Sequence, residues 1–121
     1  MKFIPMTDKT CEPAVLKADF DTAKAFAKAK VGEQCFFYPA GLCKRSYVPY
    51  ESVVWAFRRQ EEMSKAGQAF TVNKLVLVTG DKKQLEFIIH KDGAQYCFDK
   101  LKEKNPGVDI GYEKDKEEKY L

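Results

Sequence analysis

The residues best suited to chemistry in this chain are a single histidine, four cysteines and several pairs of basic residues. His90 stands beside Lys91 and Asp92, and no recognisable motif links it to a serine or a cysteine. A general base needs a positioned partner and a nucleophile or substrate pocket. His90 is therefore predicted to be an exposed residue at the end of a strand, and the chain is predicted not to be an enzyme.

The cysteines do not follow a metal-binding pattern. They are Cys11, Cys35, Cys43 and Cys97, without a CxxC pair among them, whereas structural zinc sites normally draw their ligands from closely spaced pairs. Cys35 and Cys43 flank Ala40-Gly41 and are candidates to face each other across a hairpin, as a redox pair or as reduced thiols. No metal and no cofactor is expected, because the chain also lacks a Gly-rich phosphate loop.

Basic residues occur as the pairs Lys44-Arg45, Arg58-Arg59 and Lys82-Lys83. Nucleic-acid binding would require a basic stripe interleaved with exposed aromatic residues. The net charge is only +3, with 21 basic and 18 acidic residues, so the long-range field is weak and nucleic acid is not the expected partner. A basic edge that discourages aggregation of strands explains the same residues without any ligand.

Length and composition indicate one domain. The chain has 121 residues, of which 45% are apolar and 32% charged, which is typical of a globular protein that folds alone. The N-terminus reaches Pro5 and Asp8 before a long apolar run can develop. No stretch approaches the roughly 18 to 20 apolar residues of a membrane span, and the protein is predicted to be cytoplasmic.

Helical spacing of apolar residues occurs near both ends of the chain. The first helix is predicted at about residues 19–31, capped by Asp19 or Asp21 and closed by Gly32. The second is predicted at about residues 92–104, capped by Asp92 and ended by Asn105-Pro106-Gly107. The charged tail, residues 113–121, is predicted to be a solvated helical turn or a disordered end.

Residues 33–90 carry the signals of a sheet. The predicted strands are Glu33–Pro39, Leu42–Val48, Glu51–Gln60, Phe70–Thr79 and Leu85–His90, with turns at Ala40-Gly41 and Gly80–Lys83 and a polar connection over Glu61–Gln68. Strands joined by tight turns pair antiparallel, because parallel neighbours need long crossovers. The predicted class is α+β, with a bent antiparallel sheet closed at one end by the last helix.

The segment Tyr47–Ala56 resembles the entry to a strand in bacterial pleckstrin-homology-like and GRAM-like domains, with its aromatic residue, Pro-Tyr and acidic residue. Asn105–Tyr112 is similar to the end of a group of small uncharacterised proteins from anaerobic Gram-positive bacteria. The resemblance covers roughly residues 33–112. It implies one domain over residues 1–112, with a half-open antiparallel β-barrel that the C-terminal helix caps.

Two features depart from that family's pattern. An extra helix precedes the first strand, and about five strands can be recognised where the family has seven. The two missing strands are expected in Thr10–Lys17 or around Glu61–Gln68. The hairpin tip Pro39–Leu42 also lacks the basic residues with which eukaryotic pleckstrin-homology domains grip phosphoinositides.

The function that the resemblance implies is that of a non-enzymatic binding module for a protein or peptide. A bent sheet leaves an open edge and a groove beside the last helix, where an extended peptide can add as a strand. The predicted contact residues are Tyr47, Tyr50, Arg58, Arg59, Lys44 and Arg45. The alternatives are a peripheral domain that binds anionic lipid or phosphate through Lys44, Arg45, Lys82 and Lys83, and a small-ligand carrier that uses the barrel interior.

Overall fold

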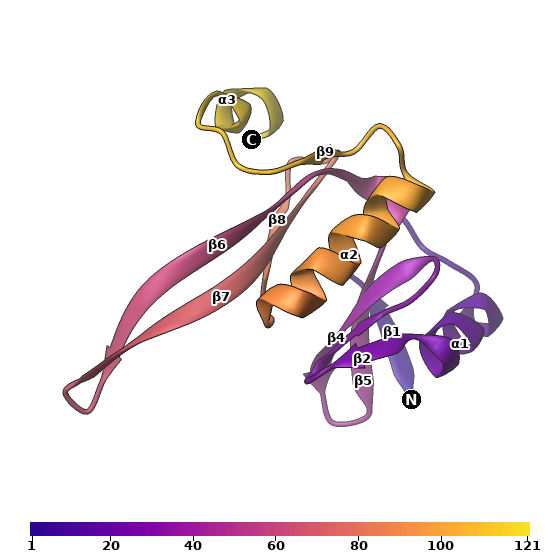
Figure 1. Cartoon of the computed structure of the whole chain (residues 1–121). Helices are drawn as coiled ribbons and strands as arrows, with labels where there is room; N and C mark the ends of the chain where they lie inside the picture. The colour runs from indigo at the N-terminus through magenta and orange to yellow at the C-terminus, as the bar shows by residue number, and fades with distance from the viewer.

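Two β-sheets and three α-helices make up the protein (Figure 1), and the computed structural model describes all residues from 1 to 121. The helices are α1 (Pro13–Thr22), α2 (Lys91–Lys104) and α3 (Asp115–Tyr120), with a 3-10 turn η1 (Tyr50–Ser52). The strands are β1 (Lys2–Pro5), β2 (Lys24–Phe26), β3 (Ala29–Val31), β4 (Cys35–Gly41), β5 (Lys44–Pro49), β6 (Val53–Lys65), β7 (Gln68–Thr79), β8 (Gln84–Ile88) and β9 (Asp109–Ile110). The predicted α+β class is confirmed. None of the helices has the length and apolar character needed to cross a membrane.

The strands form two sheets instead of the single bent sheet that was predicted. The first has the order β1-β5-β4-β3-β2 and the second the order β8-β7-β6-β9. Pro49 and the turn η1 separate β5 from β6, so the chain leaves the first sheet before it enters the second. Consecutive paired strands are antiparallel, whereas β1 and β9 join β5 and β6 in parallel. The two sheets do not close into a barrel.

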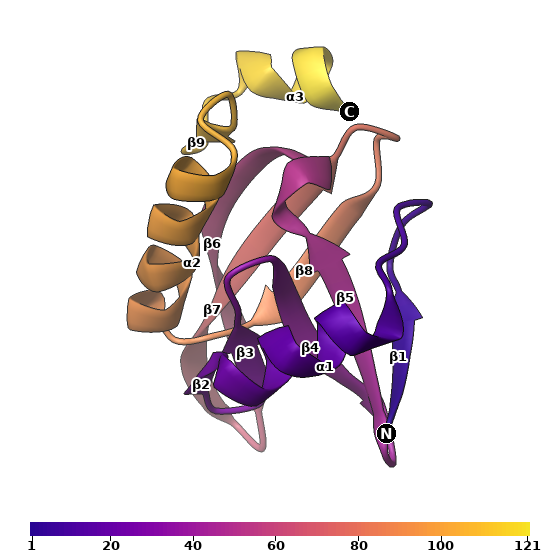
Figure 2. The same ribbon diagram turned by 90° about the vertical axis from the view of Figure 1, so that its right-hand side faces the viewer.

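The main core lies between the two sheets and α2. It is built from buried side chains of both sheets, of η1 and of α2, among them Phe36, Val48, Tyr50, Leu75, Leu77, Phe98 and Leu101. Helix α1 covers the opposite face of the first sheet and crosses in front of it in Figure 2. Helix α3 contributes Tyr120 to a smaller cluster on the opposite face of the second sheet. Both sheets are therefore covered on two faces over part of their length.

Strand β7 shows why the second sheet needs cover on both faces. Leu75 and Leu77 point into the main core, whereas Val76 and Val78 point into the smaller cluster under α3. The apolar run that predicted a central strand is confirmed, since β7 has β6 on one side and β8 on the other.

The N-terminal helix begins and ends earlier than the predicted range of 19–31. Helix α1 starts at Pro13, whose fixed φ angle suits the first helical position, and the chain is extended at Ala23. Residues 24–31 form the hairpin of β2 and β3 instead, with Ala27 at a φ of 54° in its turn. The helical spacing over residues 20–27 was misleading because it runs from a helix into a strand.

The two segments that were expected to hide strands differ in structure. Thr10–Lys17 contains the start of α1 and no strand. Glu61–Gln68, predicted as a polar connection, is extended on both sides of the turn Ala66-Gly67, so it lengthens β6 and β7 and adds no separate strand. Polar composition misled the prediction there because these residues face solvent on both sides of the hairpin.

The C-terminal helix matches the prediction to within one residue at its start. His90 takes the N-cap position predicted for Asp92, because its ring nitrogen accepts a hydrogen bond from the Asp92 amide at 3.3 Å. Asn105 ends the helix, and its side-chain amide donates to the carbonyls of Tyr50 at 3.1 Å and Val53 at 2.8 Å. These bonds hold the end of α2 against the link between the two sheets.

The charged tail is folded onto the second sheet. The ring of Tyr120 in α3 stacks on Trp55 with a centroid distance of 5.5 Å. Its hydroxyl donates to Asp109 at 3.0 Å, and Lys116 pairs with the same carboxylate at 2.7 Å. The helical turn predicted for residues 113–121 is confirmed, but it packs on β6 through Tyr120.

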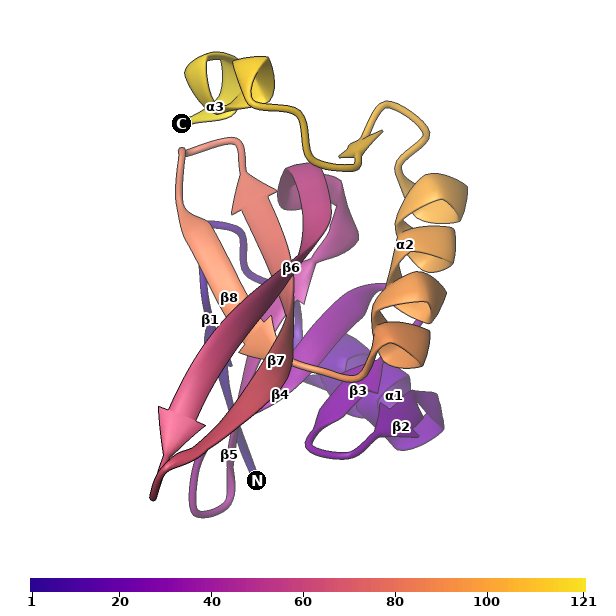
Figure 3. The same cartoon turned by 60° about the vertical axis from the view of Figure 1, so that its left-hand side comes forward.

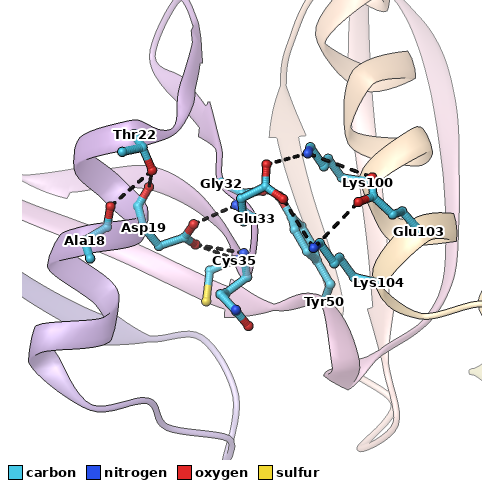
Figure 4. A network of polar contacts seen from close by, with 11 residues as sticks. Ala18, Asp19, Thr22, Gly32, Glu33, Cys35, Tyr50, Lys100, Glu103 and Lys104 are labelled. Atoms are coloured by element: carbon cyan, nitrogen blue, oxygen red, sulfur yellow. Dashed lines mark hydrogen bonds and ion pairs between the residues drawn. The ribbon is translucent and has the colours of Figure 1, made fainter.

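A buried carboxylate joins α1 to the start of β4 (Figure 4). Asp19 is 6% exposed, and its oxygens accept hydrogen bonds from the amides of Glu33 at 2.6 Å, Gln34 at 3.0 Å and Cys35 at 2.9 Å. A Cβ atom at Gly32 would overlap the Asp19 carboxylate, so this position requires glycine. Asp19 therefore acts inside α1 as an anchor for the loop that follows β3.

Replacing Asp19 by alanine should lower the free energy of unfolding by about 3 kcal/mol, because three amides would lose a charged acceptor in a buried place. The measurement is urea denaturation followed by Trp55 fluorescence. Asp21→Ala is the matched control, because Asp21 lies on the exposed face of α1 and pairs only with Lys17; the control should cost about 0.5 kcal/mol or less. Equal losses in the two variants would contradict the anchoring role.

Candidate protein interface: the projecting hairpin

The hairpin of β6 and β7 extends beyond the rest of the second sheet (Figures 1 and 3). Strand β8 pairs with β7 only from Lys74 to Val78, and β9 pairs with β6 only at Trp55 and Ala56. The backbones of residues 61–65 and 68–72 therefore pair only with each other, and those of residues 57–60 pair only with residues 73–76 of β7. We call residues 57–72 the arm.

The arm ends in a tight turn that its sequence can form. Ala66 and Gly67 both have positive φ angles, 53° and 79°, between the paired residues Lys65 and Gln68. A two-residue turn of this type matches the twist of the flanking strands. The register is continuous from Trp55 to the tip, because the only irregularity lies between Val53 and Trp55.

Ion pairs brace one face of the arm near its base. Arg59 contacts Glu86 of β8 at 2.8 Å and Glu61 at 3.6 Å, and Lys74 contacts Glu61 at 3.0 Å. The neighbouring Lys74 ammonium, followed by Arg59, holds the pKa of the Glu61 carboxyl below its ordinary value. These contacts link the base of the arm to β8.

On the other face, Arg58 and Glu62 are exposed and make no ion pair within the chain. Glu62 accepts a hydrogen bond from the Thr71 hydroxyl at 2.8 Å, and Gln60 donates to Asn73 at 3.2 Å. Two opposite charges thus lie on one strand, four residues apart, and neither of them forms an ion pair within the chain. Strand geometry keeps them too far apart to pair with each other.

The tip of the arm exposes two large apolar side chains. Met63 and Phe70 lie opposite each other in the hairpin and are 44% and 42% exposed. Both belong to the face that carries Trp55 and Phe57 nearer the body, because alternate residues of a strand share a face. The ion pairs of Arg59, Glu61 and Lys74 lie between Phe57 and Met63 on this face, so the apolar area at the tip is separate from the part that α3 covers.

The outer edge of β6 offers unpaired backbone groups along the arm. The Ala56 carbonyl accepts a hydrogen bond from the Gly111 amide at 2.9 Å, so it points away from β7. Backbone direction repeats at every second residue, and the N–H and C=O groups of Arg58, Gln60 and Glu62 point the same way. No strand accompanies β6 there, because β9 ends at Ile110.

A hollow of about 430 Å³ lies beside this open edge. Residues 57–60, Tyr112 and Glu117 line it. Tyr112 is 49% exposed, and its ring meets Phe57 edge-on at a centroid distance of 5.3 Å. Its hydroxyl donates to Glu117 at 2.9 Å, and that bond raises the pKa of Tyr112. The hollow thus has an aromatic wall and a strand edge as its floor.

The structure separates the residues predicted to form a contact surface. Tyr47 is 2% exposed and packs under α1, and Tyr50 is 1% exposed and donates from its hydroxyl to the Gly32 carbonyl. Neither aromatic side chain can meet a partner. Arg58 and Arg59 do lie together at the base of the arm, where Arg58 is exposed and Arg59 is paired.

The basic residues considered for anionic ligands lie at two ends of the protein. Lys44 and Arg45 follow the β4–β5 turn, whereas Lys82 and Lys83 lie in the β7–β8 turn. Figures 2 and 3 show these two turns at opposite ends of the molecule. The four side chains do not form one patch.

Neither the cysteines nor His90 belong to the open edge of β6. All four cysteines are free thiols, and burial raises the pKa of Cys35 and Cys97. Cys35 begins β4 opposite Pro49, whereas Cys43 lies in the turn at the other end of that strand. The cross-strand pair proposed for them is therefore wrong, because the turn falls at Leu42-Cys43 and not at Ala40-Gly41. His90 is exposed, as predicted.

The residues that define the arm were only partly visible in the sequence. Met63, Phe70 and Glu62 fall in or next to the segment that was interpreted as a connection. The available signal was Gly67 at the centre of two stretches that match as strands, since glycine readily takes the positive φ that a tight hairpin turn requires. Tyr112 could not have been found, because its place depends on the fold of the C-terminal segment.

The chain belongs to the family described as a domain of unknown function (DUF6709), whose model matches residues 1–120. The match includes α3, so the helix that packs on Trp55 lies within the family's extent. Neither the curated proteins nor the solved structures contain a match to the chain.

Removing the carboxylate of Asp109 should release α3 from the base of the arm. Hydrogen bonds from Lys116 and Tyr120 lower the pKa of Asp109, so the contact is complete above the ordinary carboxyl range near pH 4 and is lost as the pH falls through the lower folded-state pKa. Trp55 is fully buried and is the only tryptophan. Its fluorescence should shift to longer wavelength in Asp109→Ala at neutral pH.

The matched control for this change is Asp99→Ala on the exposed side of α2, which should leave the emission of Trp55 unchanged. In the unmodified protein the same shift should appear only on acidification below about pH 4. An unchanged spectrum in Asp109→Ala would show that Tyr120 stays on Trp55 without the carboxylate.

Proposed function

We propose that this protein is a non-catalytic protein-binding module and that the arm is its contact element. The observation that carries the proposal is a long two-stranded ribbon with both backbone edges open and with Met63 and Phe70 exposed at its tip. Proteins usually shield or shorten such edges, because an exposed edge pairs readily with another chain. An edge that stays open over this length is suited to accept a strand.

The energetics of the arm favour a bound state. An isolated two-stranded hairpin is at best marginally stable in water, and three or more strands are needed for independent stability. The ion pairs of Arg59 and Lys74 brace only the base. A partner strand on the outer edge of β6 would supply backbone hydrogen bonds and cover apolar area at the tip. Main-chain pairing would provide affinity, and the side chains along the arm would select the partner.

The resemblance to pleckstrin-homology-like domains is consistent with such a role, as a fold-level analogy. In that family a C-terminal helix follows a strand meander, and an open sheet edge receives extended peptides. The separation of Lys44 and Arg45 from Lys82 and Lys83 supports protein binding over the anionic-lipid alternative. A headgroup patch would need several cations within reach of one another.

Site-specific photocrosslinking in cells tests the proposal. A photoreactive phenylalanine analogue placed at Phe70 should crosslink to a protein, because this side chain lies at the tip of the arm. The same analogue placed at Leu42 is the matched control, since Leu42 is 93% exposed at the tip of the other hairpin. Crosslinks to proteins should form at position 70 in clear excess over position 42.

The outcome depends on which molecule is crosslinked and on whether the crosslink requires the open edge of β6. A crosslink to any protein, including another copy of this chain, supports the binding role when it disappears after Gln60→Pro, which removes one outward N–H group from the edge. Equal labelling at the two positions, or crosslinks to lipid alone, would refute the proposal.

A further inference from the structure

We infer that the arm's partner is a second copy of this chain, joined to the first by antiparallel pairing of the two β6 edges about a two-fold axis at Gln60. This inference rests on the proposed function and names the partner of the same surface. It begins with the order of charges along β6, where residues 58–62 read Arg-Arg-Gln-Glu-Glu.

The charges of this segment are complementary to themselves in antiparallel order. When two copies pair about Gln60, Arg58 faces the partner's Glu62 and Arg59 faces the partner's Glu61. The axis repeats each contact, so every charge of the segment lies opposite a charge of the other sign. Opposite charges across strands stabilise a pair, and like charges destabilise it. Arg58 and Glu62, which have no ion pair within the chain, would both obtain one.

No neighbouring register has this property. With the axis at Arg59, two arginines would face each other, and with the axis at Glu61, two glutamates would do so. An axis between two residues would place an outward backbone group opposite an inward one, where no ladder can form. The charge pattern therefore selects Gln60 as the centre.

The direction of the backbone agrees with the same register. The N–H and C=O groups of Arg58, Gln60 and Glu62 point outward, as the bond between the Gly111 amide and the Ala56 carbonyl establishes. In the register centred on Gln60 these residues pair with the partner's Glu62, the partner's Gln60 and the partner's Arg58. Each of these pairs exchanges two bonds, which adds about six backbone hydrogen bonds at the interface.

Apolar contacts close both ends of the paired segment. Phe57 lies opposite the partner's Met63, in a pair without mutual hydrogen bonds where the side chains approach closely. The partner's Met63 would enter the hollow beside Phe57 and Tyr112. Sulfur beside aromatic rings is a favourable contact. Strand β9 occupies the edge of β6 up to Ala56, which limits the paired segment to residues 57–63.

A two-fold interface of this kind is closed, because each copy offers the same edge and neither β6 edge stays open. The product is a discrete dimer in which four strands run side by side through the two arms. The marginal two-stranded ribbon thereby becomes part of a wider sheet.

Sedimentation velocity over a concentration series tests the inference with two charge reversals, Arg58→Glu and Glu62→Arg. Both side chains are exposed and without ion pairs, so neither change should disturb the fold of the monomer. Each variant alone should self-associate about 10- to 100-fold more weakly than the wild type, because two attractive cross-strand pairs become repulsive. The two variants mixed should form a heterodimer, since each charge then faces its opposite.

Lys28→Glu reverses an exposed charge in the β2–β3 turn and should leave the dimer unchanged. Wild-type dimerisation should weaken as the salt concentration rises. A wild-type protein that stays monomeric at its highest soluble concentration, a dimer that both reversals leave intact, or a mixture that fails to associate would each overturn self-pairing. A monomer whose position 70 still crosslinks to another protein would overturn self-pairing alone, whereas a protein that neither dimerises nor crosslinks at position 70 would overturn the proposed function as well.

Discussion

The buried carboxylate of Asp19 is the interaction on which the arrangement of the first half of the chain depends. It accepts three backbone amides from the loop between β3 and β4 and so fixes that loop to α1. With the loop fixed, Cys35 and Phe37 pack under α1, and Phe36 between them points to the main core. One polar anchor thus sets the face on which each residue of β4 lies.

The same loop also connects the first sheet to α2. Glu33 turns its carboxylate away from Asp19 and toward Lys100 at 2.5 Å and Lys104 at 3.3 Å (Figure 4). The Lys100 ammonium, followed by that of Lys104, holds the pKa of Glu33 below its ordinary value. The Tyr50 hydroxyl bonds to the Gly32 carbonyl from the side of η1. Successive residues of one short loop therefore contact α1, η1 and α2, and these contacts hold the loop in one position relative to the three elements.

The arm is constrained in the opposite way. Its base is held by ion pairs, by α3 and by Tyr112, whereas its outer half has solvent on both faces and no neighbour on either edge. Within one chain, ordering the outer half of the ribbon costs conformational entropy that burial of apolar area offsets only in part, because little apolar area is buried along it. The self-complementary charges at residues 58–62 and the unpaired backbone groups beside them lie along the edge where an additional strand would stabilise the ribbon through hydrogen bonds and ion pairs.

The sequence alone determined the α+β class, helix α2 with its end at Asn105, the central position of β7 and the turn of the β7–β8 hairpin. These features depend on short-range patterns, such as a capping position, an alternation of two residues or a turn dipeptide. The basic pair Arg58-Arg59 was predicted to belong to a contact surface, and the proposed interface includes it. Tyr47 and Tyr50 were assigned to the same surface, although both are buried, because the local sequence around a tyrosine does not show whether its side chain is buried or exposed.

The remaining features depend on contacts between residues far apart in the sequence. The division into two sheets follows from Pro49 and η1, but the sheet that receives each strand is set by long-range pairing that no local pattern specifies. Asp19 was predicted to cap the start of a helix. It lies inside α1 instead, and its carboxylate accepts hydrogen bonds from three amides of a loop that is distant in sequence. The exposure of Met63 and Phe70 has the same origin, since β8 and β9 stop short of the arm and leave its strands with no other side chains to pack against.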